Sequence, residues 1–264
     1  SLLFVEFFFV LSGFVLYPQL IQVLNNRKNL SIFYKRRWIR TLPLYFIILI
    51  MVASLFNDVL GQDFFKYLFF VQKIAPSFLS NDYYPIAWSL SIEEFFYLLF
   101  PIILIFLGKN NILKKVIILF LLILIVKLFF AINIDSDFFR TGTLFRFDAI
   151  LLGFILRFFY DKILKYKFLS SVLLLMLLVV FYFGENYILA NNEEYLVKVG
   201  FIIFLQVLSL LTLNSFLIFE PLMKINFIKN FSILISKQTY SVYLIHIIFI
   251  YLLDKAQLGI YNTV

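Results

Sequence analysis

Long apolar runs separated by short polar segments set the pattern of this chain from its beginning to its end. A helix that crosses a bilayer core of about 30 Å needs about 20 mainly apolar residues. Such windows recur, and we predict eight helical membrane spans, at about 2–19, 41–57, 88–107, 116–134, 141–160, 168–184, 196–214 and 237–253. The segment 58–87 is too long for a tight turn and too poor in apolar residues for a clean crossing, so we expect a partly embedded lid or a re-entrant piece.

The composition agrees with this pattern. Hydrophobic residues make up 63% of the chain and charged residues 14%, whereas soluble domains are roughly half apolar and a quarter charged. We therefore predict an all-α, polytopic transmembrane helical bundle that forms one membrane domain over residues 1–264. With no cysteine and a single histidine, the sequence excludes a disulfide framework and a Cys/His metal cluster, and we expect neither a metal site nor a bound cofactor.

The charges of the loops predict the direction of the spans. The basic segments "NNRKNLSIFYKRRWIR", "GKNNILKK", "DKILKYK" and "KINFIKN" alternate with loops that carry aspartate and glutamate. Positive loops belong in the cytoplasm, so the first span runs inward and both ends of the chain lie outside. The excess of 23 Lys+Arg over 15 Asp+Glu is then a feature of topology, and we do not expect nucleic-acid binding. An inward first span also predicts at least one earlier helix, in agreement with the absent starting methionine.

Ionisable groups inside spans mark candidate chemistry, because each costs about 2.5–3.5 kcal/mol at the centre of a membrane helix and is placed against protein or water. Glu6, in "VEFFFVLSGF", is the first. At helical spacing it shares a face with Phe9, Gly13 and Tyr17, and Gly13 opens that face to a neighbouring backbone. The alternative is a carboxylate that snorkels at the outer boundary.

Arg37 and Arg40 are the second candidate. They lie one helical turn apart in "YKRRWIRTLPLY", just before Pro43, where the chain enters the membrane from the cytoplasm. Two guanidinium groups on one face can bind a phosphate or a carboxylate. The alternative is an ordinary basic flank that only sets topology.

The third candidate is the segment "AWSLSIEEFFYLLFP". Ser89, Glu93 and Tyr97 follow one another at intervals of four residues and form a polar stripe, while Glu94 points about 100° away. Glu93 lies roughly 8 Å below the outer end of its helix. Two adjacent carboxylates in an apolar span are costly, so at least one of them needs a partner or a raised pKa.

The fourth candidate is "FRTGTLFRFDAILLGFILR". Arg146 and Asp148 are two residues apart and point to opposite sides of a regular helix, so each needs a partner on another helix. We expect Arg146 to pair with Glu93 or Glu6, with a purely structural ion pair as the alternative.

The only histidine, His246, lies in "KQTYSVYLIHIIF", one turn after Tyr243 and about 13 Å from the cytoplasmic end of its helix. A lone imidazole in a span is often a polar packing group that bonds across helices.

Five blocks, "VEFFFVLSGF", "RRWIRTLPLY", "AWSLSIEEFFYLLFP", "FRFDAILLG" and "YSVYLIH", occur in an order and spacing that resemble the acyltransferase 3 family of integral-membrane O-acyltransferases. The resemblance covers nearly the whole chain. It implies a core of about ten helices, of which this chain looks like helices two to nine, with the family's catalytic histidine upstream of Ser1. The roles that it implies are catalytic for Glu93, Arg146 and Asp148, donor-binding for Arg37 and Arg40, and supporting for Glu6, Ser12, Ser89, Glu94, Tyr97, Tyr243 and His246.

The resemblance also implies a reaction. Such enzymes move an acyl group, usually acetyl, from a cytoplasmic acyl-CoA to a hydroxyl of an envelope polysaccharide or lipid-linked sugar, across the bacterial cytoplasmic membrane. No serine lies in a nucleophile elbow, since "LSGF" around Ser12 lacks the required strand and turn. Direct transfer and an acyl-enzyme therefore both stay open.

Three other classes of membrane protein fit the sequence less well. A transporter or flippase of lipid-linked sugars would be expected to show paired halves and helices broken in mid-span, and the sequence shows neither. A polysaccharide polymerase or glycosyltransferase would more often carry larger outer loops. A membrane scaffold would leave the stripe around Glu93 unexplained.

Overall fold

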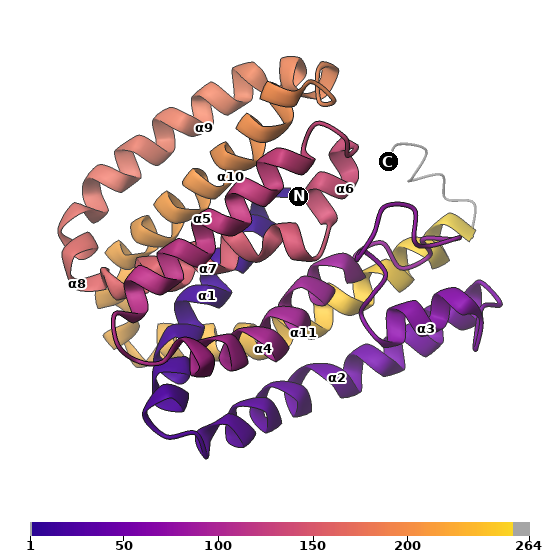
Figure 1. The fold of residues 1–264 in the computed structure, drawn as a ribbon, viewed down its shortest axis with the longest axis horizontal. Helices are drawn as coiled ribbons and strands as arrows, with labels where there is room; N and C mark the ends of the chain where they lie inside the picture. Colours follow the sequence, from indigo (N-terminus) through magenta and orange to yellow (C-terminus); the bar gives the residue numbers. More distant parts are fainter. Residues whose placement is uncertain (1, 256–264) are drawn as a thin grey trace.

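The computed structural model describes residues 2–255, and that part of the chain contains helices and turns without strands, which confirms the all-α prediction. Figure 1 shows how the helices are arranged. In chain order they are α1 (Leu2–Asn25), α2 (Asn29–Leu55), α3 (Gln62–Leu68), α4 (Ala87–Leu107), α5 (Ile112–Phe130), α6 (Ser136–Thr141), the 3-10 turn η1 (Leu144–Arg146), α7 (Phe147–Phe158), α8 (Tyr160–Ile163), η2 (Leu164–Tyr166), α9 (Lys167–Ala190), α10 (Tyr195–Phe216), η3 (Leu217–Lys224) and α11 (Asn226–Lys255).

Six helical stretches in residues 2–255 are long and apolar enough to cross a membrane: Leu3–Asn25, Asn29–Leu55, Ala87–Leu107, Tyr160–Ile188, Tyr195–Leu222 and Asn226–Leu253. They coincide with six of the eight predicted spans and indicate a multi-pass membrane protein. Several of them extend beyond the apolar windows. The helix α2, for example, begins at Asn29 and not at 41, because backbone hydrogen bonding continues into the basic flank where side chains no longer need to be apolar.

The other two predicted spans, 116–134 and 141–160, fall on shorter or more charged helices. The helix α5 has 19 residues and includes three lysines. The helix α7 has only 12 residues, which corresponds to about 18 Å and is less than a bilayer core. It follows a break at Gly142 and Thr143, where the Thr143 N–H donates to the carbonyl of Lys73 at 3.0 Å. The prediction of one continuous helix over 141–160 was therefore wrong.

Two large apolar clusters form most of the interior, and α4 belongs to both. A third, small cluster contains Ala131, Phe139 and Ile202. The first packs α1, α4, α5 and α7 together through residues such as Leu16, Phe100 and Phe154. The second joins α2, α3, α4 and α11 through residues such as Tyr45 and Leu244. In Figure 1, α2, α3, α4 and α11 occupy one half of the molecule, while α9 lies at the far edge of the other half. The helix that carries the predicted polar stripe therefore lies at the junction of the two halves.

The contact between α1 and α7 is made through two glycines. A Cβ atom at Gly13 would lie 1.8 Å from the carbonyl oxygen of Ile150, and one at Gly153 would lie 1.8 Å from the carbonyl oxygen of Val10. No side chain fits at either position, so the two backbones touch directly. This confirms the expectation that Gly13 opens its helix face to a neighbouring backbone.

Three connecting segments that carry acidic residues meet at one end of the bundle. The Lys73 ammonium lies 3.1 Å from an oxygen of Asp82 and 3.6 Å from an oxygen of Asp137. The Glu193 carboxylate accepts from the backbone N–H of Ser136 at 3.1 Å. These contacts join segments 58–87, 131–143 and 191–194, which agrees with the prediction that they share one side of the membrane.

The segment 58–87 folds into α3 and several turns that pack along α2. The ring of Phe70 stacks on Tyr45 with centroids 4.6 Å apart. Tyr45 precedes the last residue of α2 by ten positions, or about 15 Å of helix. The segment therefore reaches well down the side of α2, as the expected partly embedded lid would.

Asp63 anchors this segment. Burial by itself raises the pKa of the Asp63 carboxyl, but hydrogen bonds from the Lys66 ammonium and from two backbone N–H groups lower it more, and the net pKa lies below its ordinary value of 3.8. The two N–H groups belong to Ser80 and Asn81. The ionised carboxylate thus ties the start of α3 to a turn that lies 17 residues later.

Candidate functional site

A cavity of about 360 Å³ lies between α1, α2, α4 and α11. Residues of α1 form an apolar wall, including Phe8, Phe9 and Leu11. The polar residues that line it come from the other three helices and are Arg40, Ser89, Glu93, Ser236, Thr239, Tyr240 and Tyr243. An apolar cavity with a few convergent polar groups is typical of a ligand site.

Glu93 is one of the polar residues that line this cavity. Its carboxylate accepts a hydrogen bond from the Tyr97 hydroxyl at 3.0 Å. The same hydroxyl lies 3.0 Å from the hydroxyl of Ser12 on α1. The stripe predicted from the spacing of Ser89, Glu93 and Tyr97 is therefore present, and it continues across to α1.

The two arginines of α2 have different neighbours although they lie one turn apart. The Arg37 guanidinium lies 5.0 Å from the centre of the Tyr97 ring, in a cation–π geometry, and donates to the side-chain oxygen of Gln19 at 3.4 Å. Arg40 lines the cavity together with Glu93. The structure thus brings one predicted donor-binding residue and one predicted catalytic residue to the same hollow.

The helix α11 contributes hydroxyl groups and the histidine. The Tyr243 hydroxyl lies 2.7 Å from the Ser89 hydroxyl and donates to the carbonyl of Ile86 at 3.2 Å. The Nδ1 atom of His246 lies 2.5 Å from the carbonyl oxygen of Tyr243 in its own helix. Tyr243 faces the cavity, whereas His246 is not among the lining residues. This placement suits a polar packing group, and a chemical role for His246 stays a prediction.

Glu94 points away from the cavity, as helical spacing predicts. It accepts a hydrogen bond from the Thr41 hydroxyl at 2.8 Å, and Tyr240 donates to the carbonyl of Thr41 at 2.9 Å. Glu94 lines a smaller hollow of about 170 Å³, which it shares with Trp38. The adjacent carboxylates of α4 therefore face different environments.

Arg146 and Asp148 lie in the interior, each paired with a different helix. Arg146 pairs with Glu6 on α1, one of its two predicted partners. Asp148 lies 2.6 Å from the Lys127 ammonium on α5 and accepts from the Gln206 amide on α10 at 2.8 Å. Arg146 is 1% exposed and Asp148 0%, and neither lines the cavity. The first pair joins η1 to α1, and the contacts of Asp148 join α7 to α5 and α10. A direct part in the chemistry stays a prediction for both residues.

Sequence reasoning missed four polar residues around these groups: Thr41, Lys127, Gln206 and Tyr240. Lys127 lies in the apolar run "LLILIVKLFF", so the rule that identified Glu6 would also have identified it. Thr41, Gln206 and Tyr240 are uncharged and gave no signal, because only the packing of their helices shows what they contact.

The polar groups of the cavity suit organic ligands. The guanidinium of Arg40 can bind an anionic group, and the Glu93 carboxylate can accept a hydrogen bond from a hydroxyl. Within residues 2–255, no group of three or more His, Cys, Asp or Glu side chains is placed to hold a metal ion.

Comparison with known proteins gives one family. The model of the acyltransferase 3 family, described as an acyltransferase domain, matches residues 1–263. O-acetyltransferase OatA of Staphylococcus aureus (strain NCTC 8325) is 27% identical over 92% of this chain and 45% of its own length. An uncharacterized protein of Haemophilus influenzae is 25% identical over 72% of this chain and 89% of its own length. The chain thus spans about half the length of the first of these relatives. No solved structure matches it significantly.

Proposed function

The chain belongs to the acyltransferase 3 family, and from this premise we propose that it forms the membrane domain of a bacterial O-acyltransferase. The proposed reaction moves an acyl group, most simply acetyl, from acyl-CoA to a hydroxyl of an envelope glycan. The observation that carries the proposal is the shared cavity of Glu93 and Arg40. The relative named O-acetyltransferase supports a hydroxyl acceptor and an acetyl group. The family match lends no support to the alternative of a transporter or flippase.

The proposed role of Glu93 is to hold the acceptor hydroxyl, or the histidine that the family resemblance implies, by accepting a hydrogen bond. In the reaction, the hydroxyl oxygen forms a bond to the acyl carbon, the thioester C–S bond breaks, and the hydroxyl proton passes to the departing thiolate. A carboxylate that is fixed by the Tyr97 hydroxyl at 3.0 Å can orient that proton before the bond forms.

The proposed role of Arg40 is to bind phosphate groups of the donor. Arg40 lines the cavity and also a surface groove of about 380 Å³ along α2, which includes Lys35 and Arg36. This groove lies on the predicted cytoplasmic half of α2, where acyl-CoA would arrive. Guanidinium groups suit phosphate because they form two parallel hydrogen bonds. The acyl end of the donor would then reach into the apolar part of the cavity, next to Glu93.

Replacement of Glu93 by glutamine in the complete protein tests this proposal. We expect transfer of labelled acetyl from acetyl-CoA to the envelope glycan of intact membranes to fall about 100-fold or more, as for removal of a group that handles the proton. The amount of protein in the membrane should stay unchanged. Glu194→Gln, at an exposed position, is the matched control. Normal acetylation in Glu93→Gln would remove Glu93 from the mechanism.

Arg40→Gln gives a second test that is specific for the donor. Here we expect the KM for acetyl-CoA to rise while the KM for the glycan stays the same. A rise in both KM values would argue against a role in phosphate binding.

A further inference from the structure

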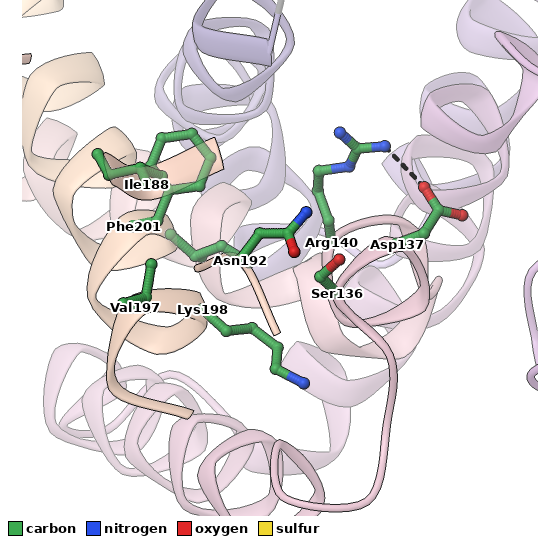
Figure 2. A pocket seen from close by; sticks show the side chains of 9 residues that line it. Ser136, Asp137, Arg140, Ile188, Asn192, Val197, Lys198 and Phe201 are labelled. Atoms are coloured by element: carbon green, nitrogen blue, oxygen red, sulfur yellow. Dashed lines mark hydrogen bonds and ion pairs between the residues drawn. The ribbon is translucent and has the colours of Figure 1, made fainter. Parts of the chain in front are cut away.

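A second cavity, of about 300 Å³, lies between α6, the end of α9 and the start of α10. Figure 2 shows its two kinds of wall. Asp137, Arg140 and Asn192 supply polar groups, and Ile188 and Phe201 supply apolar surface. The side chain of Asn192 extends toward Arg140 in this view. This cavity shares no lining residue with the cavity of Glu93.

The charges around this second cavity balance. Arg140 donates to a carboxylate oxygen of Asp137 at 2.7 Å. The Lys198 ammonium lies 3.6 Å from the Glu193 carboxylate and donates to the carbonyl of Ile134 at 2.5 Å. Each cation therefore has a carboxylate neighbour, which does not favour an acidic ligand.

The cavity offers donors that a ligand can reach. The Arg140 side chain is 35% exposed, and the two terminal nitrogens of its guanidinium carry four N–H donors, whereas its Nε atom is shielded from solvent. The amide of Asn192, which is exposed, adds two further donors and an acceptor.

We propose that this cavity binds a neutral sugar unit of the acceptor glycan, as a subsite separate from the reaction centre. A sugar ring presents hydroxyl groups around its edge and C–H groups on its faces. The edge matches the donors and acceptors of Arg140, Asn192 and Asp137, and a face matches the ring of Phe201 and the side chain of Ile188. The volume falls at the lower end of the range for small-molecule sites. This inference rests on the proposed function for its choice of acceptor.

A chain of contacts connects this subsite with the helix that carries Glu93. Asp137 lies 3.6 Å from the Lys73 ammonium, and the carbonyl of Lys73 accepts from the Thr143 N–H at 3.0 Å. The Thr143 hydroxyl lies 3.2 Å from the hydroxyl of Ser91, which precedes Glu93 by two residues. The subsite and the outer part of α4 thus belong to one connected end of the bundle. A polymeric glycan held at the subsite would present its other units at a high local concentration.

Calorimetric titration of the complete protein in lipid nanodiscs tests the subsite directly. The probes are a neutral N-acetylglucosamine tetrasaccharide and an acidic uronate-containing tetrasaccharide. We expect the neutral probe to bind and its Kd to rise about tenfold in Asn192→Ala and in Arg140→Gln, the loss expected for one or two hydrogen bonds. Arg27→Gln, at an exposed position, is the matched control and should bind like the wild type.

A kinetic readout separates the subsite from the reaction centre. In Asn192→Ala, the KM for the tetrasaccharide as acyl acceptor should rise, while the KM for a monosaccharide acceptor and for acetyl-CoA should stay the same. Equal affinity in wild type, Asn192→Ala and Arg140→Gln, or tighter binding of the acidic probe, would overturn the proposal. In a Glu93→Gln background, Asn192→Ala should still raise the Kd of the neutral probe about tenfold, so the subsite can be confirmed even if the proposed acyl transfer fails.

Discussion

Replacement of Glu6 by glutamine would leave the Arg146 guanidinium in the interior without its carboxylate partner. Arg146 is 1% exposed and Glu6 3%, so water cannot take the place of the lost charge. Removal of one partner from a buried ion pair costs about 3–5 kcal/mol of unfolding free energy. A native protein has about 5–15 kcal/mol in total. We therefore expect Glu6→Gln, and equally Arg146→Gln, to be strongly destabilised.

The double variant Glu6→Leu/Arg146→Met should behave differently. It removes both charges and fills their space with apolar side chains, a change that is often neutral or stabilising. The effects of the two sites are then far from additive, as expected for residues in contact. Thermal unfolding of the purified protein in detergent, followed by the loss of monodisperse protein on size exclusion, measures all three variants. Arg27→Gln, at an exposed position, should stay within about 0.5 kcal/mol of wild type.

Two results would refute this reasoning. Single variants as stable as the control would show that the pair contributes nothing measurable. A double variant as unstable as the single variants would show that the two buried charges do not depend on each other. The double variant also tests the predicted catalytic role of Arg146. Loss of acyl transfer in a well-folded double variant would support that role, and retained transfer would remove it, in line with the absence of Arg146 from the lining of the Glu93 cavity.

Three further predictions follow from other contacts. Gly153→Val should abolish folded protein in membranes, because its Cβ would lie 1.8 Å from the Val10 carbonyl oxygen. The control is Gly184→Val, whose Cβ approaches only Ile188, at 4.0 Å. Equal yields of the two variants in the membrane would contradict the close packing of α1 and α7. Asp63 has a lowered pKa, so its ionised form stabilises the fold above about pH 4, and this contribution is lost as the pH falls through the native pKa. The difference in Tm between wild type and Asp63→Asn should therefore shrink from pH 6 to pH 3. A difference in Tm that stays constant over this range would contradict the prediction. Tyr97→Phe should lower kcat about tenfold, because the Glu93 carboxylate loses the hydrogen bond that fixes it. The KM for acetyl-CoA should stay unchanged. Tyr182→Phe, at an exposed position, is the control, and a change in KM alone would argue against the role of Tyr97 in positioning Glu93.

The sequence by itself determined much of the framework. Apolar windows of the length of a bilayer can only be helices, because the backbone must satisfy its own hydrogen bonds in lipid, and six of the eight predicted spans are membrane-length helices. Helical spacing also determined local geometry. It placed Glu93 with Ser89 and Tyr97, turned Glu94 away, and separated Arg146 from Asp148. These features depend only on residues within one helix.

The tertiary structure decided which helices meet. Spacing left Arg146 with two possible partners, and packing through Gly13 and Gly153 brought it to Glu6. The tertiary structure also places Arg40 and Glu93 in one cavity, although the sequence had assigned them to opposite halves of the membrane. The break before α7 has the same origin, because the N–H of Thr143 is satisfied by a carbonyl 70 residues earlier in the chain. These features depend on contacts between segments that lie far apart in the sequence, and the periodicity of one helix does not show which helices pack against it.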